Sequence, residues 1–384
     1  METTRVNEQG YTGLPTLLMA LEICDSRWHV QFRCAGGTRE RRKTVAAWDR
    51  QTLKGEIERA KARLGLPPQA PVLSCYEAGR DAFSIHRWLL SIGVDSRVVD
   101  SASIEVSQRA KRVKTDRVDL GKLMALLARV HSGELHVWHE VRVPSEEDED
   151  RRRLHRERER LLKERTALGN RIGSLLATQG LRLALKPGFA QELQQLRRWD
   201  GQPLPAQLCA ELLRMWQRRQ LISQQVVQLE RQRRSEILHG GDERSAAMRA
   251  LMRLFAVGVD TAWLLDREIL GWRQIANRRQ LGALCGMTPT PYASGDSLRE
   301  QGISGAGNRR VRTAAVELAW RWLRLQPDSD LAKWFMSRFG TGSKRIRRIG
   351  IVALARKLLV ALWRYHQFGV IPAGARFKPA GREP

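Results

Sequence analysis

Short apolar runs alternate with amphipathic stretches from Leu14 to about residue 129. Residues 17–24 predict a buried strand, and the alternation of Trp28, Val30 and Phe32 with polar residues predicts a half-exposed neighbour, joined to the first by a hairpin at 25–27. Further strands are expected over 39–47, 72–76 and 96–99, and helices over 51–64, 81–92 and 116–129. The pattern predicts an α/β domain over residues 14–140.

A change of composition follows this domain. Residues 146–150 are all acidic, and residues 151–165 are rich in arginine. Apolar residues then recur at coiled-coil spacing, first at Leu154, Leu161, Leu168 and Leu175, and later at Ile222, Val226 and Leu229. We expect a helical coiled-coil hairpin over 145–240, with a loop at 201–205 between its arms; a solvated charged helix without a partner is the alternative.

The remainder of the chain is mainly helical in pattern. It predicts a C-terminal domain over 245–370, followed by a basic tail over 371–384. Residues 288–308 are rich in Gly, Ser, Pro and Thr and predict a long loop, a feature that in compact domains tends to be functional. The fold class expected for the whole chain is multidomain α/β plus α.

The charge of the chain indicates the kind of partner that it binds. The 384 residues carry 67 Lys and Arg against 41 Asp and Glu, a net charge of +26. Residues 299–384 hold 18 basic and 5 acidic residues, so 18 − 5 = +13, half of the excess. Such a balance favours a nucleic-acid partner. A basic run suited to the phosphate backbone is formed by Lys344, Arg345, Arg347 and Arg348.

Alternatives to these nucleic-acid contacts remain open. The basic run is also explained by a solvated charged face. Trp320 and Trp322 could stack on unpaired bases, or they could pack in the core.

Membrane and secretory classes are not favoured. The most apolar stretch, 349–363, contains Arg356 and Lys357, which indicates a buried amphipathic helix. Residues 1–10 are polar and resemble no signal peptide. The five cysteines form no C-x-x-C pair. We expect reduced thiols and a cytoplasmic location.

Four acidic residues occupy positions that a sheet and a helix could bring together. Glu22 lies in the first strand, Glu77 follows the 72–76 strand, and Asp116 and Asp119 share one helix face at i, i+3. Clustered carboxylates suit Mg²⁺, or Mn²⁺, in phosphoryl transfer. Surface ion pairs would explain the Asp pair, a helix cap would explain Glu77, and Asp25 is the alternative first acid.

The residues around these acids resemble a known family. Residues 20–23 (ALEI), 76–78 (YEA) and 114–119 (KTDRVD) resemble the acidic tetrad of the DEDD transposases, the insertion-sequence-110 family related to Piv invertases. The resemblance implies an N-terminal RuvC-like, RNase H-fold domain with Glu22, Glu77, Asp116 and Asp119 as catalytic metal ligands. Glu22 departs from the family pattern, which usually has Asp there. Two basic neighbours, Lys114 and Arg117, are expected to contact nucleic acid.

The resemblance continues through residues 284–289, 292–295 and 302–310, which look like the transposase domain of that family. It implies that Ser294, which precedes a glycine, is the nucleophile; Ser297 is the nearest rival. A hydroxyl needs a base or a metal for this role. A phosphate site at a helix N-terminus is predicted from Gly307, Asn308, Arg309, Arg310 and Arg312, with an ordinary glycine-rich helix entry as the alternative.

The family resemblance implies an RNA-guided DNA recombinase of an insertion sequence. It would pair a bridge RNA with donor and target DNA and rejoin strands through a covalent serine–DNA intermediate. It also implies dimers and tetramers in which different protomers supply the acids and the serine. The residues alone leave two alternatives: a RuvC-like nuclease that uses water, and a nucleic-acid-binding protein without catalysis.

Overall fold

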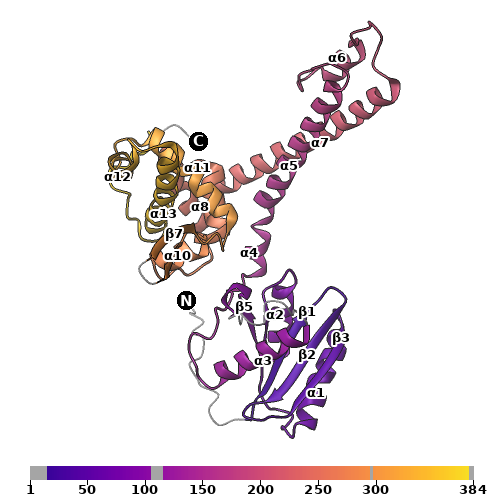
Figure 1. Cartoon of the computed structure of the whole chain (residues 1–384), viewed down its shortest axis with the longest axis vertical. Coiled ribbons are helices and arrows are strands. Elements are labelled where there is room, and N and C mark those ends of the chain that lie inside the picture. The colour runs from indigo at the N-terminus through magenta and orange to yellow at the C-terminus, as the bar shows by residue number, and fades with distance from the viewer. Residues whose placement is uncertain (1–14, 105–115, 295–296, 380–384) are drawn as a thin grey trace. The chain divides into compact units, whose positions relative to one another are not determined.

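The computed structural model describes residues 15–104, 116–294 and 297–379, and the chain forms two compact units, Met1–Pro144 and Ser145–Pro384 (Figure 1). The first unit contains a five-stranded sheet in the order β3-β2-β1-β4-β5. Its strands are β1 (Leu17–Ile23), β2 (Arg27–Cys34), β3 (Glu40–Ala46), β4 (Val72–Glu77) and β5 (Val94–Val99). Strand β2 is antiparallel to β1 and β3, whereas β1, β4 and β5 are parallel.

Helices cover both faces of this sheet because its central strands, β1 and β4, carry buried apolar residues on both sides. Odd-numbered residues of β1, such as Met19, pack in one cluster with helices α1 (Arg50–Arg63) and α2 (Ala82–Ser91). Even-numbered residues, such as Ala20, pack with helix α3 (Asp116–His131). The expected α/β domain is confirmed in its strands and helices, whose ends lie within two residues of the predicted ones.

The second unit begins with a helical hairpin. The short helix α4 (Glu146–Asp150) precedes α5 (Arg153–Ala177), which packs against α7 (Ala206–His239). Leu161, Ile222 and Val226 are buried between the two long helices, as the heptad spacing predicts. The loop prediction was wrong in extent: residues 178–205 separate the helices and include α6 (Phe189–Gln195), because Phe189 packs on Trp216 with ring centroids 4.8 Å apart.

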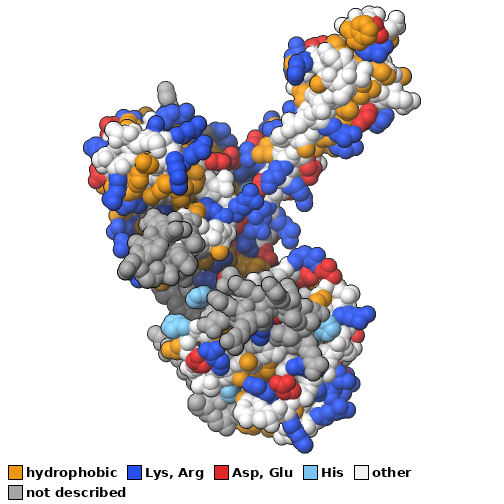
Figure 2. Space-filling view, viewed as in Figure 1, with side chains coloured by type: hydrophobic (Ala, Val, Ile, Leu, Met, Phe, Trp, Pro, Cys, Tyr) orange, Lys and Arg blue, Asp and Glu red, His pale blue; other side chains and the backbone are white. Residues whose placement is uncertain are grey.

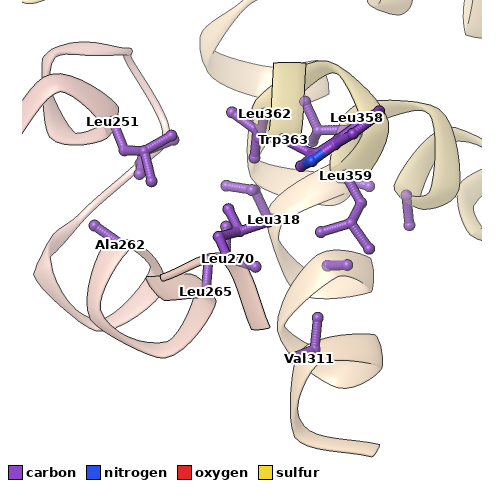
Figure 3. Packing of buried hydrophobic residues seen from close by; sticks show 14 of the residues in the cluster. Leu251, Ala262, Leu265, Leu270, Val311, Leu318, Leu358, Leu359, Leu362 and Trp363 are labelled. Carbon is purple, nitrogen blue, oxygen red and sulfur yellow. The ribbon is translucent and has the colours of Figure 1, made fainter. Parts of the chain in front are cut away.

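The rest of this unit is mainly helical, as predicted. A π-helical turn, η3 (Asp266–Leu270), and one large apolar cluster lie among the helices α8 (Glu243–Arg253), α9 (Val259–Leu265), α10 (Arg278–Leu284), α11 (Arg309–Leu325), α12 (Asp330–Phe339) and α13 (Lys344–Phe368). Figure 3 shows Leu318 of this cluster beside Leu265 and Leu270, with Leu358 and Leu362 of α13 on its other side. None of the described helices has both the length and the apolar character to cross a membrane.

Two predictions for this unit need correction. Residues 288–308 do not form a structureless loop, because β6 (Pro289–Ser294) and β7 (Ser297–Ile303) pair as an antiparallel hairpin. Trp322 cannot stack on a base, because it is fully buried and its Nε1 donates a hydrogen bond to Ser329 Oγ at 2.9 Å.

The basic tail was predicted as a separate segment. Its described part, up to residue 379, packs against the unit. Lys378 donates from its backbone nitrogen to the Arg253 carbonyl oxygen at 2.7 Å.

A buried carboxylate, Glu268, joins three parts of this unit. Its oxygens accept hydrogen bonds from His155 Nε2 at 2.7 Å, from Arg156 Nε and Nη2 at 2.8 and 3.0 Å, and from Asn308 Nδ2 at 2.9 Å. Burial alone would raise the pKa of Glu268, but the hydrogen bonds from His155 and Arg156 outweigh it and hold the pKa well below its ordinary value. Glu268 therefore ties α5 to the residue that caps α11.

Replacing Glu268 by alanine should lower the free energy of unfolding by about 3 kcal/mol, since the buried His155 and the more exposed Arg156 both lose the carboxylate that they bind. The measurement is urea unfolding of the full chain followed by tryptophan fluorescence, because eight of the twelve tryptophans lie in this unit. Glu164→Ala, which removes an exposed partner of Arg160, is the control and should change stability by no more than about 0.5 kcal/mol. Equal effects of the two variants would contradict this role.

Candidate catalytic residues and the serine hairpin

Glu22 and Glu77 lie near or at the carboxyl ends of two neighbouring parallel strands. The register pairs Leu17 with Val72 and Ala20 with Cys75, an offset of 55, and the same offset makes Glu22 level with Glu77. Both continue the face to which Ala20 and Cys75 belong, the face that α3 covers. The side chain of Glu77 is exposed and that of Glu22 is partly buried. Two carboxylates are therefore placed on one face at one edge of the sheet.

Helix α3 contributes the second pair of acids from the same face. Asp116 is its first residue and Asp119 is in its first turn, where Asp119 Oδ1 accepts from Lys122 Nζ at 3.2 Å. The buried Cys75, two residues before Glu77, donates from Sγ to the Leu123 carbonyl oxygen at 3.6 Å, and burial raises the pKa of this thiol. This contact fixes α3 against β4 one turn beyond Asp119.

The described carboxylates do not form a metal-ligand group by themselves. Within residues 15–104, 116–294 and 297–379, no three His, Cys, Asp or Glu residues are grouped so as to hold a metal ion. The positions of the Asp116 and Arg117 side chains are not described, and Lys114 lies outside the described residues. The four-carboxylate site therefore stays a prediction, for which the strand register and α3 supply the arrangement.

Asp25, the alternative first acid, has a different environment from Glu22. It lies in the exposed turn between β1 and β2 and forms an ion pair with Arg80, which also binds Asp81 at 3.0 Å. The hydrogen bond from Arg80 lowers the pKa of Asp81. Asp25 is thus held in a surface ion-pair network, whereas Glu22 lies in β1 at the position that is level with Glu77 of β4.

Ser294 is the last residue of β6, at the tip of the β6–β7 hairpin in the second unit. Backbone hydrogen bonds hold the base of this hairpin. Ser304 and Asn308 donate from their nitrogens to the carbonyl oxygens of Thr288 and Leu284, both at 2.8 Å. The rival Ser297 is the opposite member of the last strand pair, so the backbone places both serines at the tip.

The glycine-rich entry to α11 is tightly packed against the chain before the hairpin. Gly307 has φ of +135°, and a Cβ at this position would lie 2.6 Å from the Gly286 nitrogen and the Leu284 carbonyl oxygen. Asn308 caps α11 by accepting from the Val311 nitrogen at 3.2 Å while donating to Glu268. These two residues have structural roles here, and their phosphate contact stays a prediction.

The predicted cations differ in how far they are already paired. Arg310 Nε binds Glu159 at 2.6 Å, and Arg312 Nη1 donates to the Cys285 carbonyl oxygen at 2.9 Å. Arg309 is the first residue of α11. The four cations of the basic run lie in the first turns of α13 and are all exposed. This run is accordingly the strongest of the predicted nucleic-acid contacts.

Sequence reasoning missed the cations that continue this run along α13. Arg356 and Arg364 follow Arg345 at intervals of 11 and 8 residues, which repeat on one helix face, and all three line one groove. The helical period of these arginines is the pattern that could have shown their shared face. At the level of sequence, Arg356 served only as an argument against a membrane-spanning helix. Glu268 was also missed, because nothing local in the sequence marks its partners on α5.

Known proteins that resemble the chain are transposases. Residues 248–333, which include the serine hairpin, match the model of the transposase IS116/IS110/IS902 family. The protein y4rJ of Sinorhizobium fredii (strain NBRC 101917 / NGR234), named as a transposase, is 39% identical over 379 residues, covering 95% of each chain. The transposase for insertion sequence element IS1328 of Yersinia enterocolitica is 26% identical over 227 residues, covering 59% of this chain and 65% of the relative.

Two glycine substitutions separate the stability lost through a positive φ from the stability lost through the close packing at Gly307. Gly305→Ala should cost about 1 to 2 kcal/mol of stability, because φ is +68° but a Cβ there meets nothing within 4 Å. Gly307→Ala should cost at least about 2 kcal/mol more, because the added Cβ also meets backbone atoms. Urea unfolding of both variants tests this; equal losses would mean that the close approach at Gly307 is unimportant.

Proposed function

Because the chain belongs to the IS116/IS110/IS902 family of insertion-sequence transposases, we propose that this transposase cuts and rejoins donor and target DNA through Ser294 and an acidic metal site, directed by a guide RNA. One observation carries the chemical part of this proposal. The parallel register makes Glu22 and Glu77 level on the sheet face covered by α3, the helix that begins with Asp116 and Asp119.

The donor set suits a hard divalent cation. Four carboxylates supply only oxygen ligands, which Mg²⁺ and Mn²⁺ prefer over the nitrogen and sulfur ligands of zinc sites. Glu22, Glu77, Asp116 and Asp119 would hold the ion. When bound, the ion would offset the negative charge of a phosphate and favour ionisation of an attacking hydroxyl. Lys122, 3.2 Å from Asp119, would offset part of the mutual repulsion of these acids before an ion binds.

Two further features support the remaining parts of the proposal. The mixed sheet, in the order β3-β2-β1-β4-β5 with β2 antiparallel, is the arrangement expected of an RNase H-like domain of the RuvC type. Ser294 would attack the phosphodiester, forming the Oγ–P bond while the bond to the departing sugar oxygen breaks, and a later sugar hydroxyl would reverse the exchange. No external energy source is then needed for rejoining.

The guide RNA and the oligomer rest on family resemblance and charge. A net charge of +26 is compatible with binding both DNA and a second polyanion. The acids lie in the first unit and Ser294 in the second, which is compatible with an active site assembled from two protomers.

Conservative replacement of the acids tests this function. Asp119→Asn and Glu77→Gln should each lower the Mg²⁺-dependent rate of DNA strand cleavage at least about 100-fold, because a metal ligand loses its charge. DNA affinity should change less than about threefold. The assay contains purified protein, the RNA encoded beside its gene, and donor and target plasmids.

Glu58→Gln is the matched control, since Glu58 is an exposed carboxylate of α1 in the same unit and its loss should leave cleavage unchanged. Full cleavage by Asp119→Asn and Glu77→Gln would overturn the metal-site assignment. Loss of DNA binding together with cleavage would indicate that these acids support the fold instead.

A further inference from the structure

A groove of about 910 Å³ runs along α13 in the second unit. It lies between that helix, α10, α12 and the base of the serine hairpin, where Pro289 and Ile303 are paired. Of its eighteen lining residues that the structure describes, seven are Arg or Lys and none is Asp or Glu. Figure 2 shows basic and apolar side chains intermixed on this part of the unit. The groove is therefore built for a ligand with negative charge.

The cations of the groove are not occupied by acidic side chains. In the part of the chain that the structure describes, Arg345, Arg348, Arg356 and Arg364 form no ion pair. From Arg345 to Arg364 is 19 residues, which at a rise of about 1.5 Å per residue is about 28 Å of helix. The positive charge thus follows a line, as the phosphates of an extended strand do, and is not concentrated at one point.

Apolar residues alternate with these cations and form the floor. Ile349 is 56% exposed, and Trp334 lies beneath Lys357, whose Nζ is 4.7 Å from the ring centroid. A duplex presents phosphates outward and keeps its bases stacked inside, so it would leave this floor in water. An unpaired strand presents phosphates and base faces together and matches both parts of the groove.

A second hollow, of about 590 Å³, shares the lining residue Arg348 with the first. Lys344, Arg347 and Arg348 line it together with Trp320, and Arg348 lines both hollows. The Trp320 side chain is 42% exposed, unlike the buried Trp322. An exposed indole between cations is a stacking platform for a base of any sequence.

We propose that this groove binds a single-stranded segment of DNA beside the cleavage hairpin, with its phosphates along α13 and one of its bases on Trp320. The location selects DNA: Pro289, five residues before Ser294 in β6, lines the groove, so a strand that leaves the groove there adjoins the strand bearing the proposed nucleophile. The groove would hold the unpaired strand close to the cut until rejoining. This inference rests on the proposed function in taking DNA as the substrate and Ser294 as the nucleophile.

Binding is tested without cleavage. The full-length protein is titrated with a fluorescein-labelled single strand of DNA, the corresponding duplex, and RNA of the same sequence, and anisotropy is followed over a range of salt. The double variant Arg345→Gln, Arg356→Gln should bind single-stranded DNA roughly tenfold more weakly at 0.1 M salt. Its slope of log K against log salt should fall in magnitude by about 1.4, the value for two lost phosphate contacts on a single strand.

The matched control is Arg324→Gln, Arg338→Gln. It removes the same charge from exposed residues of the same unit that do not line either hollow. It should leave the slope unchanged, and the duplex should show little dependence on the groove. Equal losses in both double variants, equal groove dependence for duplex, or greater groove dependence for RNA than for the DNA strand would each overturn the proposal.

Base stacking has its own readout. A single strand carrying 2-aminopurine should be quenched on binding at one position, and Trp320→Leu should relieve that quenching. Trp199→Leu, at a tryptophan that is 90% exposed on the helical hairpin, is the control and should have no effect. Quenching that survives in Trp320→Leu would remove Trp320 from the site. If the protein binds single-stranded DNA in the groove but forms no covalent serine–DNA adduct, the proposed function is contradicted and the groove proposal is not.

Discussion

The buried carboxylate of Glu268 is the interaction on which the second unit most depends. A charged group that is 2% exposed is stable only when cations and hydrogen-bond donors surround it, and here they come from α5 and from the cap of α11. Arg310 and Glu159 add a second link between the same two helices. The helical hairpin is consequently joined to the segment that anchors the serine hairpin, and the two cannot separate without exposing or isolating a charge.

Backbone packing supplies the other constraint on the serine hairpin. Residues 284–288 and 304–308 bond to each other, and Gly307 allows an approach that no side chain would permit. Ser294 therefore stands at the tip of a two-stranded projection with a rigid base. In the first unit, the register of β1 and β4 has the same effect on Glu22 and Glu77, since backbone pairing makes the two carboxylates level.

Most of the first unit could be predicted because its information is local. Apolar runs gave the strands, and the i, i+3 spacing of Asp116 and Asp119 gave their shared helix face. The level positions of Glu22 and Glu77 could not be predicted, because register between strands 55 residues apart is set by the sheet. The hairpin at 289–303 was missed because its Gly, Pro and Ser residues have low strand propensity, which pairing overrides. Glu268 was missed because its partners lie 112 and 113 residues earlier and 40 later.

The central claim is that Ser294 attacks DNA, and the direct measurement is a covalent adduct. Purified protein, its neighbouring RNA, and end-labelled donor and target DNA are incubated with Mg²⁺ and separated on a denaturing gel. The account predicts a slowly migrating labelled band that protease removes and that Ser294→Ala lacks, while Ser297→Ala retains it. Cut DNA ends without such a band would contradict the serine mechanism and indicate hydrolysis by water.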